Sequence, residues 1–389
     1  MVYRMTEWIE CTLDKLGEIV GGATPSTKCE DYYGGSIPWI TPKDLSSFKG
    51  RYITSGERNI TEKGLASCSA QMMPKDAVLF TSRAPIGYVA IASQSVCTNQ
   101  GFKSIVVNEK ADPLFVYYLL KYNKDAIEAM GSGTTFKEVS GKTMRAVKVR
   151  IPLDVSYQKR IAAVLDSLDT KIANNERIND NLQQQAMALY AEMFLNSSDN
   201  NVTSGTLSDI AVITMGQSPS GNSYNEDGVG EVFYQGRAEF GFRFPKRRLF
   251  TTEPKRMAET GDVLLSVRAP VGDLNVAYES CCIGRGLGAI HSKTGHSSFV
   301  LYTMFALKSQ LDVFNGEGTV FGSINRDALN AIPIDVPLVT KIDRFEAVAH
   351  PIDELIRTNY EENCRLEAIR DSLLPKLMSG EIDVSAVQL

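Results

Sequence analysis

Two stretches of the chain place hydrophobic residues at alternating steps of four and three, the heptad rhythm of helices that pack along one another. Each stretch predicts a helix of roughly 33 residues, about 50 Å long at the rise of an α-helix. The heptad positions of the first stretch are Ile161, Leu165, Leu168, Ile172, Asn175, Asn179, Leu182, Ala186, Leu189 and Met193. Those of the second are Phe345, Ala349, Ile352, Ile356, Asn359, Asn363, Leu366, Arg370, Leu373 and Leu377.

Asparagines interrupt both hydrophobic patterns at matching places. Asn175 and Asn179 interrupt the first stretch, and Asn359 and Asn363 the second. If the helices pack antiparallel, their centres meet and the four amides can bond to one another, whereas an amide that faces leucine is buried without a partner. We therefore expect an antiparallel coiled coil whose register the asparagines fix, with the globular units inverted at opposite ends. The alternative is that each helix packs on its own domain as an ordinary amphipathic helix.

The remaining sequence is typical of short strands and loops with a few helices. Residues 76–81 form a run of β-branched and aromatic residues that predicts a buried strand, closed by an Arg-Ala-Pro turn. Residues 112–129 have helical spacing, and Pro113 suits the first helical turn. Residues 301–314 repeat this helix. We expect α+β units, each with a curved, mixed or antiparallel sheet.

The globular pattern occurs twice. Residues 77–152 align with residues 262–337 at a constant offset of 185 without a gap, although most side chains differ. Two short motifs return in order: Arg-Ala-Pro-Ile/Val-Gly from Arg83 and Arg268, and Gly-x-Gly-Thr-x-Phe from Gly131 and Gly316. A duplicated scaffold with diverged surfaces is suited to reading two similar but non-identical targets.

The length of the chain agrees with this duplication. Single cores rarely grow beyond roughly 250–300 residues, so 389 residues should hold about two domains and their connections. The predicted segments are a globular unit at 1–155, a long helix at 156–198, a second globular unit at 199–339, a second long helix at 340–380 and a C-terminal tail at 381–389.

Composition favours a cytoplasmic protein. No apolar run approaches the roughly 18 residues of a membrane span, and the first residues lack the apolar stretch of a signal peptide. The seven cysteines are odd in number, scattered and never spaced CxxC, so neither a disulfide framework nor a zinc site is expected. We expect no membrane contact and a reducing compartment.

The net charge of −5 argues against nucleic-acid binding only as an average over the chain. Between residues 243 and 256 the only acidic residue is Glu253. The basic residues of this segment are Arg243, Lys246, Arg247, Arg248, Lys255 and Arg256. Such a cluster suits a phosphate backbone, and its alternative is a solvated face.

Catalytic motifs are hard to find. Residues 140–143, Ser-Gly-Lys-Thr, look like the end of a phosphate loop, but Phe136 stands where the Walker pattern needs glycine. No GxGxxG follows a strand, no HExxH occurs, and the histidines all fall in the second half. The repeat therefore preserves architecture rather than a reaction centre, and we expect neither a catalytic site nor a metal site.

This organisation resembles the specificity subunit of Type I restriction-modification systems. Two variable units, each followed by a long helix, carry both doubled motifs in the same order. The resemblance covers nearly the whole chain and depends on the doubled set, because neither motif is specific alone. It implies two target recognition domains that each read half of a bipartite, asymmetric DNA site and are held apart by an antiparallel coiled coil.

The resemblance also implies partners. Two methyltransferase subunits on the coiled coil would carry S-adenosylmethionine and methylate adenine at N6, and two restriction subunits, in systems that cleave DNA, would use ATP. This chain would bind double-stranded DNA without a cofactor or catalysis of its own. The alternatives are a stand-alone DNA-binding module or transcriptional regulator, an adenine methyltransferase with an unrecognised site, and a protein-interaction scaffold.

Residues 37–45 and 232–240 correspond in pattern and supply the base-reading candidates, Lys43, Gln235 and Arg237. Lysine and arginine can contact guanine, and glutamine adenine; the alternative is that these are loop residues in water. The candidates for contacts to the DNA backbone, which position without specifying, are Arg83, Thr134, Thr135, Lys137, Lys142, Arg243, Lys246, Arg247, Arg248, Arg268, Thr319, Ser323 and Arg326. The alternative for Arg83 and Arg268, which we favour, is a structural pairing with a backbone carbonyl.

Overall fold

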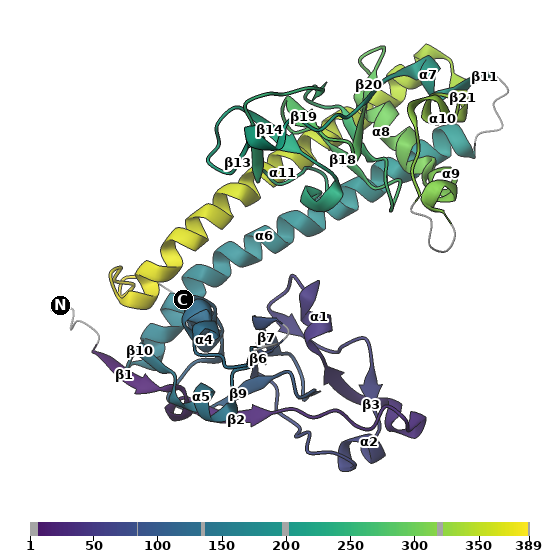
Figure 1. Ribbon diagram of the computed structural model, residues 1–389. Helices are drawn as coiled ribbons and strands as arrows, with labels where there is room; N and C mark the ends of the chain where they lie inside the picture. Colours follow the sequence, from purple (N-terminus) through teal and green to yellow (C-terminus); the bar gives the residue numbers. More distant parts are fainter. Residues whose placement is uncertain (1–6, 84, 134–136, 197–201, 317–321, 388–389) are drawn as a thin grey trace. The chain divides into compact units, whose positions relative to one another are not determined.

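The computed structural model (Figure 1) divides the chain into two compact units. It describes residues 7–83, 85–133, 137–196, 202–316 and 322–387. Unit 1 consists of Met1–Asn175 and Glu362–Leu389, and unit 2 of Glu176–Glu361. Both boundaries fall within long helices, α6 (Val155–Tyr190) and α11 (Val339–Ser379), so each unit contains part of both. No helix in the described ranges has the length and apolar character of a membrane span.

Unit 1 contains three small sheets. Its strands are β1 (Trp8–Thr12), β2 (Gly17–Gly21), β3 (Tyr33–Ile40), β4 (Tyr52–Ile53), β5 (Asn59–Ile60), β6 (Val78–Ser82), β7 (Ile86–Ala92), β8 (Cys97–Thr98), β9 (Lys103–Val107) and β10 (Lys148–Pro152). The sheet orders are β1-β10, β2-β9-β6-β7-β4 and β5-β3-β8. Most neighbours are antiparallel, whereas β3 and β8 run parallel, as do β4 and β7. The short helices are α1 (Pro42–Ser46), α2 (Glu62–Ala66), α3 (Pro113–Tyr122), α4 (Lys124–Ala129) and α5 (Gly141–Ala146).

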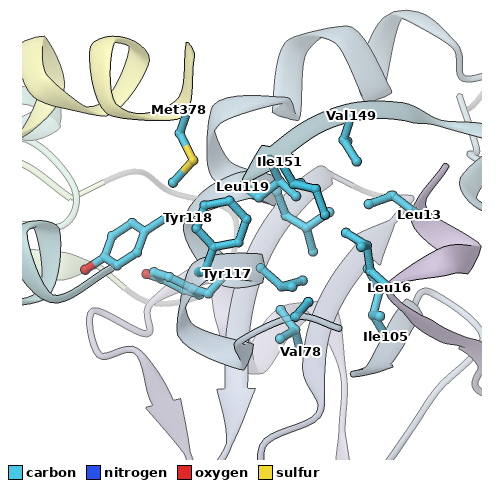
Figure 2. Packing of buried hydrophobic residues seen from close by; sticks show 14 of the residues in the cluster. Leu13, Leu16, Val78, Ile105, Tyr117, Tyr118, Leu119, Val149, Ile151 and Met378 are labelled. Carbon is cyan, nitrogen blue, oxygen red and sulfur yellow. The ribbon is translucent and has the colours of Figure 1, made fainter. Parts of the chain in front are cut away.

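The core of unit 1 lies between the β2-β9-β6-β7-β4 sheet, α3 and the long helices. All five residues of β6 are buried, which explains why Val78, Leu79 and Phe80 are apolar in succession, without a polar residue between them. Figure 2 shows Tyr117 and Tyr118 of α3 within this cluster, together with Met378 from the C-terminal end of α11. Residues at both ends of the chain therefore complete one core.

Unit 2 repeats this plan. Its strands are β11 (Val202–Thr206), β12 (Ala211–Met215), β13 (Tyr224–Asn225), β14 (Glu231–Tyr234), β15 (Leu249–Thr251), β16 (Met257–Ala258), β17 (Val263–Ser266), β18 (Leu274–Val276), β19 (Cys281–Ile283), β20 (Leu287–Ser292) and β21 (Pro333–Pro337). The sheet orders are β11-β21, β12-β20-β17-β18 and β13-β15-β14-β19-β16. The parallel pair β14-β19 matches β3-β8 of unit 1. The short helices are α7 (Leu207–Ile210), α8 (Ser297–Ala306), α9 (Lys308–Asp312) and α10 (Arg326–Asn330).

The expected constant offset of 185 is wrong around α3 and α8. The offset holds from β6 to β17 and from β10 to β21, but α3 and α8 begin 184 residues apart. The turn between β9 and α3 occupies residues 108–112, whereas the turn between β20 and α8 occupies residues 293–296. The first turn is therefore one residue longer. Tyr118 therefore corresponds to Tyr302.

The expected strand at 76–81 is present as β6, but the expected helices are divided. Residues 112–129 form α3 and α4 with a break at Asn123, and the repeat at 301–314 begins earlier, at Ser297, and divides into α8 and α9. Asp112 precedes the first helix and accepts a hydrogen bond from the Phe115 N–H, so it is the N-cap.

The long helices pack antiparallel within each unit, as the heptad pattern predicts. In unit 1, Asp169 of α6 pairs with Arg370 of α11, and Asn175 pairs with Asn363 further along. The positions increase along one helix as they decrease along the other, which defines the antiparallel direction. Ile161 and Leu165 also lie in the unit 1 core, so the alternative of a helix packed on its own domain holds for that part of α6.

Candidate nucleic-acid interface

The asparagines of the heptad pattern pair across the two long helices. In unit 1, Asn175 Nδ2 donates to Asn363 Oδ1 at 2.8 Å and to Glu362 Oε2 at 2.7 Å. This bond and the one from Lys171 lower the pKa of the Glu362 carboxyl. Asn363 Nδ2 donates to the Ile172 carbonyl at 3.4 Å. The buried amides of this pair are therefore satisfied by the opposite helix.

Unit 2 contains the second pair. Asn359 Nδ2 donates to Asn179 Oδ1 at 2.8 Å, and Asn179 Nδ2 donates to the Ile356 carbonyl at 3.3 Å. Both residues are less than a tenth exposed. Because each amide needs the amide of the other helix, a shift of the pairing would leave polar groups buried against aliphatic side chains.

A tyrosine attaches each globular core to its long helix, a feature that the sequence did not reveal. Tyr118 Oη donates to Asp169 of α6 at 2.8 Å, and Tyr302 Oη donates to Asp353 of α11 at 2.8 Å. Burial, reinforced by Asp169, raises the pKa of Tyr118, which keeps its hydroxyl a donor. The signal was present, because both the tyrosines and the aspartates recur 184 residues apart.

Lys43, the base-reading candidate of unit 1, lies on the exposed side of α1. Its side chain is 77% exposed and forms an ion pair with Glu57 at 2.6 Å, and this hydrogen bond raises the pKa of the lysine. Asp44 connects α1 to the residues around Glu57. Its carboxylate accepts hydrogen bonds from the N–H of Thr41, the N-cap of α1, and from the N–H of Glu57, each at 2.7 Å. A shallow depression lies here, lined by Lys43, Asp44, Ser47, Phe48, Tyr52, Ile53, Thr54, Ser55, Gly56 and Glu57.

Gln235 and Arg237, the candidates of unit 2, follow β14 and are both exposed. Arg237 begins a short 3-10 turn, Arg237–Glu239, and forms an ion pair with Asp273. The residues before them, Phe233 and Tyr234, are buried. The buried strand therefore presents both side chains at the surface, as β3 and α1 present Lys43.

The basic segment after this turn is partly exposed. Lys246, Arg247 and Arg248 are exposed. Arg247 donates to both carboxylate oxygens of Glu279, which raises the pKa of the arginine. Arg248 Nη2 donates at 2.5 Å to Glu239, which is buried. Arg247 therefore pairs with a partly exposed carboxylate and Arg248 with a buried one.

Arg243 does not belong with them. It is only 4% exposed, and its guanidinium donates to Asp353 and Gln183 of the long helices. A phosphate has no access to this side chain, so we remove it from the candidates for DNA backbone contact. Its isolation from its basic neighbours depends on contacts distant in sequence, which a charge count does not detect.

The remaining backbone candidates lie around the repeated loops. In unit 1, Arg83 is half-buried and forms an ion pair with Glu138 at 3.6 Å, while Lys137 and Lys142 are exposed. In unit 2, the backbone of Arg268 bridges that of Ser323, and both side chains are exposed, as is Arg326 at the start of α10. Thr134, Thr135 and Thr319 lie outside the described residues.

The described part of the chain contains no group of three or more His, Cys, Asp or Glu residues that could hold a metal ion. His291 contacts the buried Asp262 at 2.6 Å, and His296 contacts Asp343 at 2.9 Å. In the Ser-Gly-Lys-Thr segment, Ser140 caps α5 by accepting from the Thr143 N–H at 3.0 Å. These contacts account for the polar residues structurally.

Comparisons with known proteins agree with the duplicated fold. The family model of the Type I restriction modification DNA specificity domain matches residues 5–184. The chain is 30% identical to the Type I restriction enzyme MjaIX specificity subunit of Methanocaldococcus jannaschii, over 97% of this chain and 94% of that protein. It is 29% identical to the EcoR124I/EcoR124II specificity subunit of Escherichia coli, over 41% of this chain and 40% of that protein.

A solved structure supports the fold. The S subunit of a Type I restriction-modification system from M. genitalium aligns with a TM-score of 0.60, covering 97% of each chain at 17% sequence identity. Two β-rich domains, each followed by a long helix, are therefore common to both, as the α+β expectation required. With a relative 30% identical along nearly its whole length, the chain belongs to the family of Type I restriction enzyme specificity subunits.

Proposed function

We propose that this chain recognises a bipartite, asymmetric DNA sequence, with one half-site read by each unit. One observation carries the proposal: matched strands of the two units present different chemistry at the surface. Lys43, which pairs with Glu57, follows β3, whereas Gln235 and Arg237 follow β14. Lysine and arginine can bind the edge of a guanine, and glutamine can bind the edge of an adenine. Equivalent scaffolds with different readers would select different half-sites.

We assign the recognition domains to residues 1–155 and 199–339, the spacer helices to 156–198 and 340–380, and the tail to 381–389. As a specificity subunit, the chain supplies recognition rather than catalysis to a multisubunit restriction enzyme. Two methyltransferase subunits with S-adenosylmethionine would methylate adenine N6, and two restriction subunits with ATP would cleave unmodified DNA. Such a complex would act in the cytoplasm, where the chromosome is accessible.

Exposed apolar side chains on the long helices support docking of these subunits. Ile178 and Met187 of α6, and Val348 and Leu355 of α11, are each more than a third exposed in unit 2. Val348 and Leu355 are one heptad apart and therefore lie on one face of α11, and apolar side chains exposed along one helix face commonly mark a protein interface. A complex in which partners cover them would bind DNA better than the chain alone.

The test is to sequence genomic DNA for N6-methyladenine in cells with the gene, without it, and with it restored, while the methyltransferase subunit is expressed throughout. We expect one split, asymmetric motif to lose methylation on both strands without the gene and to regain it on restoration. An unchanged pattern with an active methyltransferase would reject the proposal. Tight, sequence-specific binding by the purified chain alone would instead favour a stand-alone DNA-binding module.

A further inference from the structure

The loop that carries the unit 2 readers is attached to the long helices at its centre. The chain leaves β14 at Gln235 and enters β15 at Leu249. Both ends of this loop are exposed, but Arg243 and Phe244 between them are 4% and 5% exposed. The loop therefore turns inward at Arg243 and Phe244, between the base-reading candidates and the basic residues 246–248.

Arg243 forms the attachment through a buried set of hydrogen bonds. Its Nη1 donates to Asp353 Oδ1 of α11 at 3.0 Å, and its Nη2 donates to Gln183 Oε1 of α6 at 3.0 Å. The same Nη2 lies 3.3 Å from Tyr302 Oη, which donates to Asp353. The planar guanidinium thus contacts both long helices and α8 at once, a geometry that lysine cannot reproduce.

Aromatic packing and the loop's own bonds support the attachment. The centroid of the Phe244 ring lies 5.0 Å from the ring centroid of Tyr360 on α11 and 5.6 Å from the ring centroid of Tyr278. The buried Glu239 accepts from Arg248, and its carbonyl accepts from the Lys246 N–H at 2.8 Å. The two halves of the loop therefore bond to each other, and Arg243 and Phe244 hold the loop against the two long helices.

Unit 1 also has an arginine that pairs with a long helix, at a position that the sequence repeat does not align. Arg51 lies between Lys43 and Glu57 in the chain, in the segment that forms the depression. Its Nε is 2.6 Å from Asp166 Oδ1, and its Nη2 donates to Thr170 Oγ1 at 2.7 Å, both on α6. Two loops that differ in sequence therefore each contain an arginine that pairs with a long-helix carboxylate.

We propose that Arg243 and Arg51 are positioning residues for half-site recognition. Arg243 fixes the recognition loop of unit 2 against both long helices, and Arg51 fixes that of unit 1 against α6, so that the side chains facing the bases keep one geometry. Neither arginine contacts DNA itself. The inference rests on the proposed function and adds the residues through which each unit's specificity depends on its helices.

The experiment uses the complete complex with methyltransferase subunits and a DNA library in which each half-site is varied in turn. Arg243→Met keeps the bulk of the side chain but removes its hydrogen bonds. We expect it to lower discrimination at one half-site by roughly tenfold, the order of one base contact, with the other half-site and the salt dependence unchanged. Arg51→Met should affect the opposite half-site alone. Arg243→Lys should recover part of the lost discrimination.

Arg344→Met, at an exposed arginine of α11, is the control for loss of charge and should leave both half-sites unchanged. If Arg243→Met does not fold, Gln183→Met removes a single acceptor of the same network and is judged by the same outcome. An equal loss at both half-sites, or no loss, would overturn the positioning role. A wild-type complex with no two-part preference would instead reject the proposed function.

Discussion

Several of the exposed cations that we propose as DNA contacts already have carboxylate partners. Arg237 pairs with Asp273, Arg247 with Glu279, and Lys43 with Glu57. Exposed pairs of this kind contribute little to stability because water screens the two charges, so a phosphate or a base edge can replace the carboxylate at small cost. The net charge of −5 is therefore compatible with DNA binding, because the acidic partners occupy the same surface as the readers.

Arg237→Ala should relax recognition at one half-site and leave the other intact. Loss of a paired contact to guanine costs about 1–3 kcal/mol of discrimination. Binding to a library with each base pair of the site varied would measure it, with Asp335→Ala on β21 as the control for an exposed charge change in the same unit. A uniform loss across all sequences would remove Arg237 from the base readers.

Lys246→Ala should weaken DNA binding without changing its sequence preference. Each phosphate contact releases a counterion, so the slope of log K against log salt should become shallower by about 0.9. Titration at several salt concentrations checks this, beside Lys159→Ala at an exposed position of α6. If the slopes of the two variants agree with that of the wild type, Lys246 belongs to a solvated face.

At the scale of the helices, Asn359→Leu should destabilise the unit 2 pairing more than a double substitution does. The single change leaves Asn179 Oδ1 without the donor that Asn359 supplies, and a buried unsatisfied acceptor costs about 1–3 kcal/mol. Asn179→Leu/Asn359→Leu replaces both amides with apolar groups and should recover that loss. Denaturant unfolding of all three variants tests the coupling; additive effects would contradict a direct amide pair.

Lengthening both long helices by one heptad should change the spacer between the half-sites and preserve the half-sites themselves. Seven residues preserve the heptad pattern, so the seam between the helices continues through the insertion. The methylated motif of the lengthened protein would report the spacer directly. An altered half-site would show that the helices also shape the readers, beyond setting a distance.

The long helices and the class of the globular units were predictable because their signals are periodic and local. The meeting of the four asparagines could be predicted because Asn175 and Asn179 fall at the same steps of the heptad pattern as Asn359 and Asn363. The burial of Arg243 could not be predicted, since it depends on Asp353, more than a hundred residues away, and the basic residues at 246–248 are exposed. The offset of 184 at α3 and α8 does not follow from the two repeated motifs, because one residue more in a turn between them leaves both motifs unchanged.

At the scale of the molecule, unit 1 is assembled from the two ends of the chain. Leu377, Met378 and Val384 lie in its core with residues from the first half. Tyr157 Oη donates to Asp383 at 3.0 Å and accepts from the Val384 N–H at 3.2 Å. The tail is therefore a structural part of unit 1.

Removal of residues 380–389 should destabilise unit 1 and spare unit 2. The deletion exposes the surface that Val384 covers, and a buried valine contributes about 1.5–3 kcal/mol. Hydrogen exchange resolved along the chain would show faster exchange in β6 and α3 than in β17 and α8. Equal protection in the full-length and truncated proteins would mean that the tail does not stabilise the core of unit 1.

The discontinuity of unit 1 also bears on how the protein is made. Unit 2 is one continuous segment, whereas unit 1 needs residues from Glu362 onward. At about 5–20 residues per second, the nascent first domain waits roughly 10–40 s for those residues. The part that leaves the ribosome first is then the last to close, and a ribosome that stalls late in the message would release a finished second domain joined to an open first one.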